Sequence, residues 1–296
     1  KQRPELAAVE ADFLHLLSSW YNPGFLKLTR VDWHSPAHLL EQIIRHEAVH
    51  AIRDWSDLRR RLQPDRRCFT FLHPILPEDL LIFVEVALVN AMPEAIAPLI
   101  DGDNVDLHPE RVRHAVFYSI SNCQPGLRGV SLGNFLIKQV CETLKSEFPR
   151  LTRFCTLSPM PGFASWLRRG APFDAKRLPK GAGVRVEQAR TALHKAFGDP
   201  LQPPELAALE AAEKPVREAL LRLGGAYLLL TRNHDAASDP VANFHLDNGA
   251  RIERLNYLAN RSTRGLRESW GMMGNYVYDL PAIERCHENF VEGTGE

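Results

Sequence analysis

The sequence predicts an α+β protein in which a helical N-terminal segment precedes a sheet flanked by helices. Residues 1–62 carry apolar side chains at helical spacing. From residue 67 three runs rich in Val, Ile and Phe follow one another, CFTFLHPIL, LLIFVEVAL and HAVFYSIS, as is typical of strands. The helix-like NFLIKQVCETLKSEF then leads into the strand-like RLTRFCTLS, and a short crossover of this kind implies a parallel pair.

The composition is that of a globular protein and excludes several classes of function. The chain has 296 residues, of which 45% are hydrophobic and 24% are charged. Lys plus Arg and Asp plus Glu number 36 each, so the net charge gives no argument for binding nucleic acid or an anionic membrane. No run approaches the roughly 20 apolar residues that span a bilayer. Five cysteines without a C-x-x-C pair predict neither a disulfide framework nor a cysteine zinc site, and favour a reducing compartment.

The N-terminal segment contains the zinc motif H-E-x-x-H in the stretch RHEAVH. Ser35 is the expected N-cap of a helix that runs to Leu62, and His46 and His50 would share one face of it. The extended zinc motif requires a Gly and a third His, but Arg53 and Ser56 stand at those positions. We therefore favour an amphipathic helix and predict no metal site.

The remaining chain predicts a catalytic domain at residues 67–296, after an N-terminal helical part at residues 1–66 that could serve oligomerisation. Residues 168–223 are charged and rich in Ala, which indicates a helical insertion. AYLLLTRN, VANFHLDNGARIERLNYLA and GNYVYDL are expected to supply the last strands.

A glycine-rich stretch, SNCQPGLRGVSLGNFLIKQV, stands between the third strand and the next helix. Glycines let backbone amides approach a phosphate, and a helix N-terminus favours an anion. The stretch lacks the G-x-G of the dinucleotide fingerprint and the Gly-Lys-Ser/Thr of the P-loop. From spacing alone, a glycine turn that permits tight packing of a helix on the sheet is an equally good interpretation.

The segment RGVSLGNFL resembles the acyl-CoA pyrophosphate loop of the GCN5-related N-acetyltransferase (GNAT) fold, with Ser131 in place of a central Gly. Longer stretches, including EFPRLTRFCTLSPMPGFASWL and DPVANFHLDNGARIERLNYLANRSTRGLRESWGMMGNYVY, resemble the malonyl-CoA decarboxylase family. The resemblance implies an acetyltransferase-like mixed sheet whose central strands, HAVFYSIS and RLTRFCTLS, are splayed to admit the pantetheine arm. It also implies that CoA is bound by Arg128, Gly129, Val130, Ser131, Leu132, Gly133 and Asn134.

The same resemblance implies conversion of malonyl-CoA to acetyl-CoA and CO2 without a cofactor or metal. Its catalytic residues are Ser158 in LSPMPGF, which positions the substrate, and His245 in NFHLDNGA, which protonates the thioester enolate. We expect His245 in a strand. From the residues alone, a turn serine before Pro and a hydrogen-bonded core histidine remain alternatives.

Two other functions stay open, an acyltransferase that acts on amines and a non-catalytic acyl-CoA sensor. Asn248, Tyr276 and Tyr278 are expected to support the two catalytic side chains. We further expect a homo-oligomer, and a bacterial, cytoplasmic location because the C-terminal VEGTGE is not a peroxisomal signal.

Overall fold

A computed structural model describes residues 4–101, 107–127, 129–130, 132–173, 180–198, 201–229 and 239–293. The chain forms two compact units. Unit 1 comprises Lys1–Ala91 and Ile100–Thr152, and unit 2 comprises Met92–Leu99 and Arg153–Glu296. Helices and strands occur in both units, which confirms the predicted α+β class.

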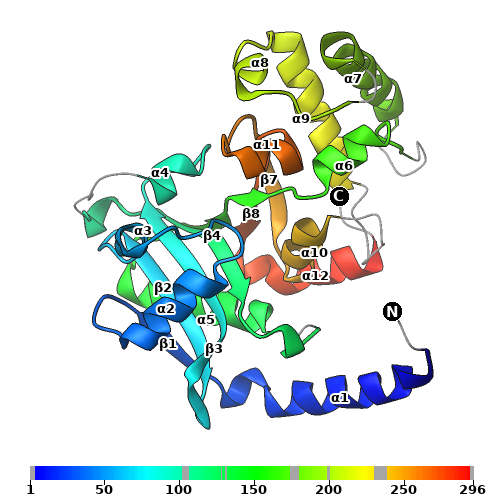
Figure 1. Cartoon of the computed structure of the whole chain (residues 1–296). Coiled ribbons are helices and arrows are strands. Elements are labelled where there is room, and N and C mark those ends of the chain that lie inside the picture. The colour runs from blue at the N-terminus through cyan, green and yellow to red at the C-terminus, as the bar shows by residue number, and fades with distance from the viewer. Residues whose placement is uncertain are drawn as a thin grey trace. The chain divides into compact units, whose positions relative to one another are not determined.

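Unit 1 is built on an antiparallel sheet in the order β1-β2-β3-β4 (Figure 1). Its strands are β1 (Lys27–Val31), β2 (Arg66–His73), β3 (Leu76–Val89) and β4 (His114–Asn122). The long strand β3 is exposed at its start and buried from Leu80 to Leu88, where its Leu, Ile, Phe and Val side chains meet helices on both faces of the sheet. The sheet therefore forms the core of this unit.

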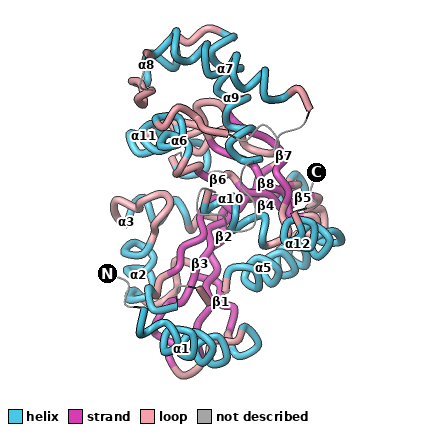
Figure 2. The backbone as a smooth tube through the Cα atoms, turned by 90° about the vertical axis from the view of Figure 1, so that its right-hand side faces the viewer, coloured by secondary structure: helices cyan, strands magenta, loops and turns pink. Residues whose placement is uncertain are grey.

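The helices of unit 1 cover both faces of the sheet. Figure 2 shows α2 and α3 on one face and α5 on the other. Leu136 and Val140 of α5 and Ile43 of α2 are fully buried, and the burial of each large side chain stabilises the unit by about 2 kcal/mol. The helices are α1 (Ala7–Trp20), α2 (Ala37–His46), α3 (Trp55–Arg61) and α5 (Gly133–Glu147), with 3-10 turns at Pro4–Leu6, Pro23–Phe25, Pro109–Arg111 and Pro125–Leu127.

The prediction that residues 1–62 are all helical is wrong at β1. Val31 pairs with Cys68 of β2, so these N-terminal residues extend the sheet instead of preceding it as a separate helical part. The segment KLTRV is too short to show a helical period, and Thr29 and Val31 are β-branched residues that favour a strand.

The single helix expected from Ser35 to Leu62 is also wrong, since α2 ends at His46 and α3 begins at Trp55. Glu47 ends the first helix. Its carboxylate accepts hydrogen bonds from the backbone N–H of His50 at 2.7 Å and from the Ser119 hydroxyl of β4 at 2.7 Å. His46 and His50 therefore do not share a helical face.

Ser35 does not cap α2, whose N-cap position is Pro36 with no side-chain hydrogen bond. The Ser35 hydroxyl instead accepts the N–H of Asp32 at 3.0 Å, within the turn that leads to the helix. The serine is thus used by a local turn, a frequent competitor of helix capping.

A buried ion pair fastens α3 to the sheet of unit 1. Arg61 and Glu85 are each 1% exposed at their side chains, and Nη1 of the arginine lies 3.0 Å from a carboxylate oxygen of the glutamate. Asp57 adds a second carboxylate at 3.3 Å from Nε. Removal of one partner would leave a buried charge without compensation.

Unit 2 is arranged around β8, which is buried along its whole length. β8 pairs antiparallel with β5, β6 and β7. The strands are β5 (Arg153–Thr156), β6 (Ser158–Pro159), β7 (Arg251–Asn256) and β8 (Met273–Tyr278). In this arrangement Ser158 lies opposite Gly274 of the central strand.

Helices surround these strands. They are α6 (Phe163–Arg168), α7 (Ala182–Phe197), α8 (Leu206–Glu210), α9 (Lys214–Leu229), α10 (Pro240–Asp247), α11 (Thr263–Ser269) and α12 (Ile283–Glu292), with α4 (Ala97–Ile100) beginning in the 92–99 segment and a 3-10 turn at Leu280–Ala282. α7, α8 and α9 fall largely within residues 168–223. None of the helices in the described part of the chain has the length and apolar character that crossing a bilayer requires.

Two of the strands expected in the C-terminal part are helices. Ala226–Leu229, the described part of AYLLLTRN, belongs to α9, and the apolar stretch VANFHLD forms α10. α10 starts because the Asp239 carboxylate accepts the N–H groups of Val241 and Ala242, both at 3.0 Å, and Pro240 suits the first helical position. His245 therefore lies on a helix, not on a strand.

Candidate active site

The structure brings together Ser158 and His245, which are 87 residues apart in the sequence. Ser158 begins β6, and His245 lies in the last turn of α10. Ser158 Oγ and His245 Nε2 are 2.8 Å apart, and each residue is 5% exposed. A hydroxyl and an imidazole in direct hydrogen-bond contact form a pair that can move a proton.

One carboxylate, that of Asp239, joins the two sequence motifs. While Oδ1 caps α10, Oδ2 accepts the Tyr227 hydroxyl at 2.9 Å and the N–H of Gly162 at 3.3 Å. Gly162 belongs to the LSPMPGF motif, so the turn after Ser158 is tied to the start of the helix that carries His245. Burial raises the pKa of the Asp239 carboxyl, while the hydrogen bonds from the backbone and from Tyr227 act in the opposite direction.

Gly162 is the residue that this junction requires. A Cβ at this position would lie 2.2 Å from the Tyr227 hydroxyl oxygen, closer than two unbonded atoms approach. Tyr227 is itself held in an aromatic cluster with Phe163 and Trp166 of α6, with ring centroids 5.6 and 5.4 Å away. The aromatic cluster and the glycine together fix the position of the turn.

His245 contacts two tyrosines of β8 that the sequence indicated as supporting residues. Nδ1 is 2.8 Å from the Tyr278 hydroxyl, and the Tyr276 ring packs against the imidazole with centroids 4.7 Å apart. Tyr276 and Tyr278 are two residues apart on one strand, so their side chains point to the same face. Burial lowers the pKa of His245 to about 3, and the imidazole is therefore neutral near pH 7.

Asn248, the third supporting residue predicted, ends α10. Its N–H donates to the carbonyl of Phe244 at 3.1 Å, and the residue is buried. Gly249 follows with φ of 76°, and a Cβ there would lie 2.3 Å from the carbonyl oxygen of Ile283. The N-G pair thus makes the tight turn that leads from α10 to β7.

Thr156 is part of the site and was missed by sequence reasoning. The Ser158 hydroxyl donates to Thr156 Oγ1 at 2.9 Å, and Oγ1 also accepts the N–H of Tyr276 at 3.2 Å. Asn275 donates to the Thr156 carbonyl at 2.8 Å. The spacing T-x-S on a strand was the available signal, since residues i and i+2 share one face.

The predicted CoA-binding residues lie in unit 1, between β4 and α5. Gly129, Val130, Leu132 and Gly133 are described, whereas Arg128, Ser131 and the side chain of Asn134 fall outside the described residues. Gly129 has φ of 94°, a left-handed conformation that favours glycine, and α5 begins at Gly133. The stretch is therefore a left-handed turn that enters a helix N-terminus.

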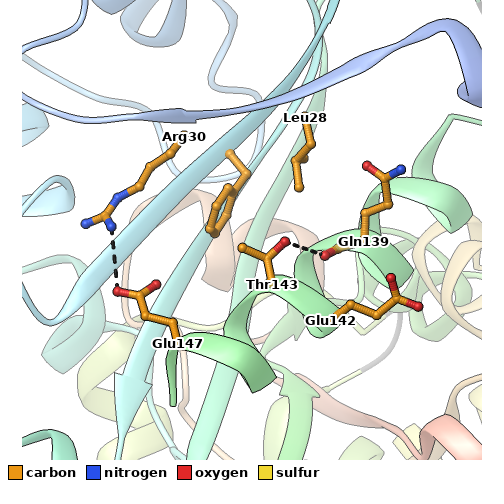
Figure 3. A pocket seen from close by; sticks show the side chains of 7 residues that line it. Leu28, Arg30, Gln139, Glu142, Thr143 and Glu147 are labelled. Atoms are coloured by element: carbon orange, nitrogen blue, oxygen red, sulfur yellow. Dashed lines mark hydrogen bonds and ion pairs between the residues drawn. The ribbon is translucent and has the colours of Figure 1, made fainter. Parts of the chain in front are cut away.

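A groove of about 470 Å³ occupies another part of unit 1 (Figure 3). Arg30 of β1 and Glu147 of α5 face each other across it at 3.6 Å. Its lining residues are Leu28, Arg30, Phe69, Gln139, Glu142, Thr143 and Glu147, and none of these is a predicted site residue.

Comparison with known proteins identifies the family. Residues 24–296 match the family described as the malonyl-CoA decarboxylase C-terminal domain. The chain is 48% identical to a solved malonyl-CoA decarboxylase from Rhodopseudomonas palustris, with a TM-score of 0.82 over 98% of this chain and 68% of that one. A second solved structure, from Agrobacterium vitis, is 46% identical with a TM-score of 0.82 and covers 98% of this chain and 69% of that chain.

A curated relative, the mitochondrial malonyl-CoA decarboxylase of Rattus norvegicus, is 38% identical over 286 residues. The alignment covers 94% of this chain and 58% of the rat protein, so the chain spans somewhat more than half of the length of that relative. The match extends over nearly the whole chain and includes both the glycine-rich stretch and the buried serine–histidine pair. The chain belongs to the malonyl-CoA decarboxylase family.

Proposed function

We propose that this chain converts malonyl-CoA to acetyl-CoA and CO2. The observation that carries the proposal is the buried contact between Ser158 and His245, with Tyr278 on the far side of the imidazole. The names of the similar proteins support the same substrate. Loss of CO2 moves the electron pair of the breaking C–C bond into the thioester carbonyl, so the substrate itself is the electron sink.

His245 is the residue that we assign to protonation of the enolate. Its imidazole is neutral, and a neutral imidazole is a strong enough acid to protonate a thioester enolate carbon. As Nε2 gives up its proton, Nδ1 takes one from the Tyr278 hydroxyl 2.8 Å away. Reprotonation of Nε2 from solvent and return of the Nδ1 proton to the phenolate then restore the starting state.

Ser158 and Tyr276 are the residues that we assign to substrate positioning. The Ser158 hydroxyl lies beside the imidazole, where it can contact the bound malonyl group and orient it toward His245. The Tyr276 hydroxyl is buried and has no hydrogen-bond partner among the described residues. A buried phenol without a partner is costly, and a bound carboxylate or enolate would satisfy it.

We assign the CoA pyrophosphate to Arg128, Gly129, Val130, Ser131, Leu132, Gly133 and Asn134. The left-handed Gly129 and the N-terminus of α5 support this assignment, because the N-terminal end of a helix dipole favours an anion.

The experiment that tests the function uses the purified chain with malonyl-CoA, in parallel with and without a strong chelator. We expect equal amounts of CO2 and acetyl-CoA, with no effect of the chelator. In a parallel reaction, acetyl-CoA and a panel of amines should give no acylated amine. Binding of CoA esters without release of CO2 would instead favour the acyltransferase or the sensor.

We also propose that the chain assembles with copies of itself. The helix α1 buries none of its residues, and its large apolar side chains are exposed, with Phe13 at 61% and Trp20 at 60%. Such side chains mark surfaces that other protein covers. Light scattering should give a mass of at least twice 33.5 kDa for the chain, and a smaller mass for a Phe13→Lys, Trp20→Lys variant.

A cytoplasmic location is part of the same proposal. The cysteines are free thiols, which suits a reducing compartment. The similar proteins from rat and mouse are named as mitochondrial, so the compartment has to be measured in the source cell. Recovery of the chain in the cytosolic fraction would support the proposal.

A further inference from the structure

The hydrogen bonds around Ser158 determine where the proton of His245 resides. A serine hydroxyl has one proton to donate. Ser158 donates it to Thr156 Oγ1 at 2.9 Å, although His245 Nε2 is equally close to Ser158 Oγ at 2.8 Å. While Ser158 donates to Thr156 it can only accept from Nε2, and this arrangement places the imidazole proton on Nε2. Nδ1 then has a free lone pair and accepts the O–H of Tyr278.

Hydrogen bonds to its hydroxyl oxygen and to its backbone carbonyl hold Thr156 in place. The N–H of Tyr276 donates to its hydroxyl oxygen at 3.2 Å, and Asn275 donates to its carbonyl at 2.8 Å. Asn275 is fixed in turn, because its Oδ1 accepts from Asn256 at 2.7 Å and from Arg254 at 3.2 Å. Thr156 and Asn275 are fully buried, so water does not compete for these bonds.

Within the described part of the chain, no carboxylate contacts the His245 ring. The ring contacts the hydroxyls of Ser158 and Tyr278 and the rings of Tyr276 and Phe244. In serine hydrolases a carboxylate holds the proton on Nδ1, which leaves Nε2 free to take the serine proton. A phenol can both donate and accept, so the contact with Tyr278 is compatible with either tautomer. The tautomer is therefore set on the Nε2 side of the ring, by Ser158 and Thr156.

On the basis of the function proposed above, we propose that Thr156 is a positioning residue that selects decarboxylation over thioester hydrolysis. By taking the Ser158 proton, it keeps His245 as the Nε2–H tautomer, ready to protonate the enolate. The same bond stops Ser158 from attacking the thioester carbonyl, because Nε2 is already protonated and cannot accept the serine proton.

The reaction that Thr156 suppresses can be written in full. Ser158 Oγ would attack the thioester carbonyl, its proton would pass to Nε2, and the C–S bond would break to release the thiolate of CoA, which takes that proton. Water would then hydrolyse the acyl-serine to malonate. The net reaction converts malonyl-CoA and water to malonate and free CoA, without release of CO2.

The test compares Thr156→Val, which keeps the shape and removes the hydroxyl, with Thr156→Ser, which keeps the hydroxyl. The first readout is the ¹⁵N NMR spectrum of histidine-labelled protein, in which the His245 signals are identified by their loss in His245→Gln. We expect the proton on Nε2 in the wild type and in Thr156→Ser, and on Nδ1 in Thr156→Val.

The second readout is the partition of malonyl-CoA between CO2 and free CoA thiol. In Thr156→Val we expect CO2 release to fall about tenfold, the effect of one buried hydrogen bond, while thiol release rises relative to CO2. Thr156→Ser should restore the wild-type ratio. An unchanged tautomer and an unchanged ratio in Thr156→Val would overturn the proposal.

The test does not depend on how well the valine variant folds. The wild-type tautomer alone is enough to refute the proposal, because a proton on Nδ1 of His245 in the resting protein is incompatible with the role of Thr156. The tautomer measurement also needs no substrate. If the wild type shows the Nε2–H tautomer but releases no CO2, the proposed function fails while the hydrogen-bond direction stands.

Discussion

The buried neutral imidazole of His245 predicts a specific pH dependence of stability. Burial lowers its pKa from 6.5 to about 3 in the folded protein, whereas the unfolded chain retains the ordinary value. Between these two values the unfolded state binds a proton that the folded state does not. The contribution of this histidine to stability is therefore complete above pH 6.5 and is lost progressively as the pH falls toward 3.

The size of the effect follows from the same two values. At pH 5 the unfolded imidazole is protonated in about 97% of molecules, which costs the folded state about 2 kcal/mol. At pH 3 the loss reaches about 4 kcal/mol. This is a large share of the stability of an ordinary domain, which is about 5–15 kcal/mol.

Urea unfolding at pH 7 and pH 5 measures this loss in the wild type and in His245→Gln. Other buried acids also titrate in this range, but their contributions are common to both proteins and cancel in the difference. We expect the wild type to lose about 2 kcal/mol more than the variant. The exposed His15 offers a matched control, and His15→Gln should keep the full wild-type dependence. Equal losses in wild type and His245→Gln would refute the neutral buried imidazole.

Three further predictions concern positions outside the serine–histidine contact itself. In thermal unfolding, Gly162→Ala should lower stability by about 2 kcal/mol or more, because its Cβ would lie 2.2 Å from the Tyr227 hydroxyl. Gly225→Ala is the control: a Cβ at that position meets open space, so this variant should be neutral or slightly stabilising. Tyr278→Phe should reduce kcat about tenfold with little change in KM, since it removes the proton source at Nδ1; an equal fall in CoA-ester binding would contradict that role. Arg61→Met should lower the free energy of unfolding in urea by about 3–5 kcal/mol, because it leaves the buried Glu85 of β3 without its partner. A loss below about 1 kcal/mol would show that the Arg61–Glu85 pair does not hold α3 to the sheet.

Much of the sheet could be predicted from the local residue pattern. The errors lie where tertiary contacts or helix capping decide the type of an element or where it ends. The runs around Phe69, Val84 and Phe117 are apolar and β-branched, and they do form β2, β3 and β4. The break after His46 could not be predicted, because the partner of the Glu47 carboxylate is a serine 72 residues away.

The helix that carries His245 could have been predicted. Asp239 followed by Pro240 is a helix-start signal, and the structure shows that aspartate capping α10. The apolar run VANFHL was taken as a strand because short apolar stretches do not distinguish the two structures. Ser158 and His245 were found only through the family resemblance. The direction of their hydrogen bond, and with it Thr156, required the positions of atoms from β5, β6, β8 and α10 together.

The most direct test of the account is the rate of CO2 release from malonyl-CoA labelled with ¹³C at its free carboxyl group. The wild type and His15→Gln should release labelled CO2 at the same rate and form one acetyl-CoA for each CO2. His245→Gln should be slower by a factor of about 100 or more, the usual effect of removing a positioned proton donor. Labelled CO2 released equally fast by His245→Gln, or none released by the wild type, would contradict the assignment of this site.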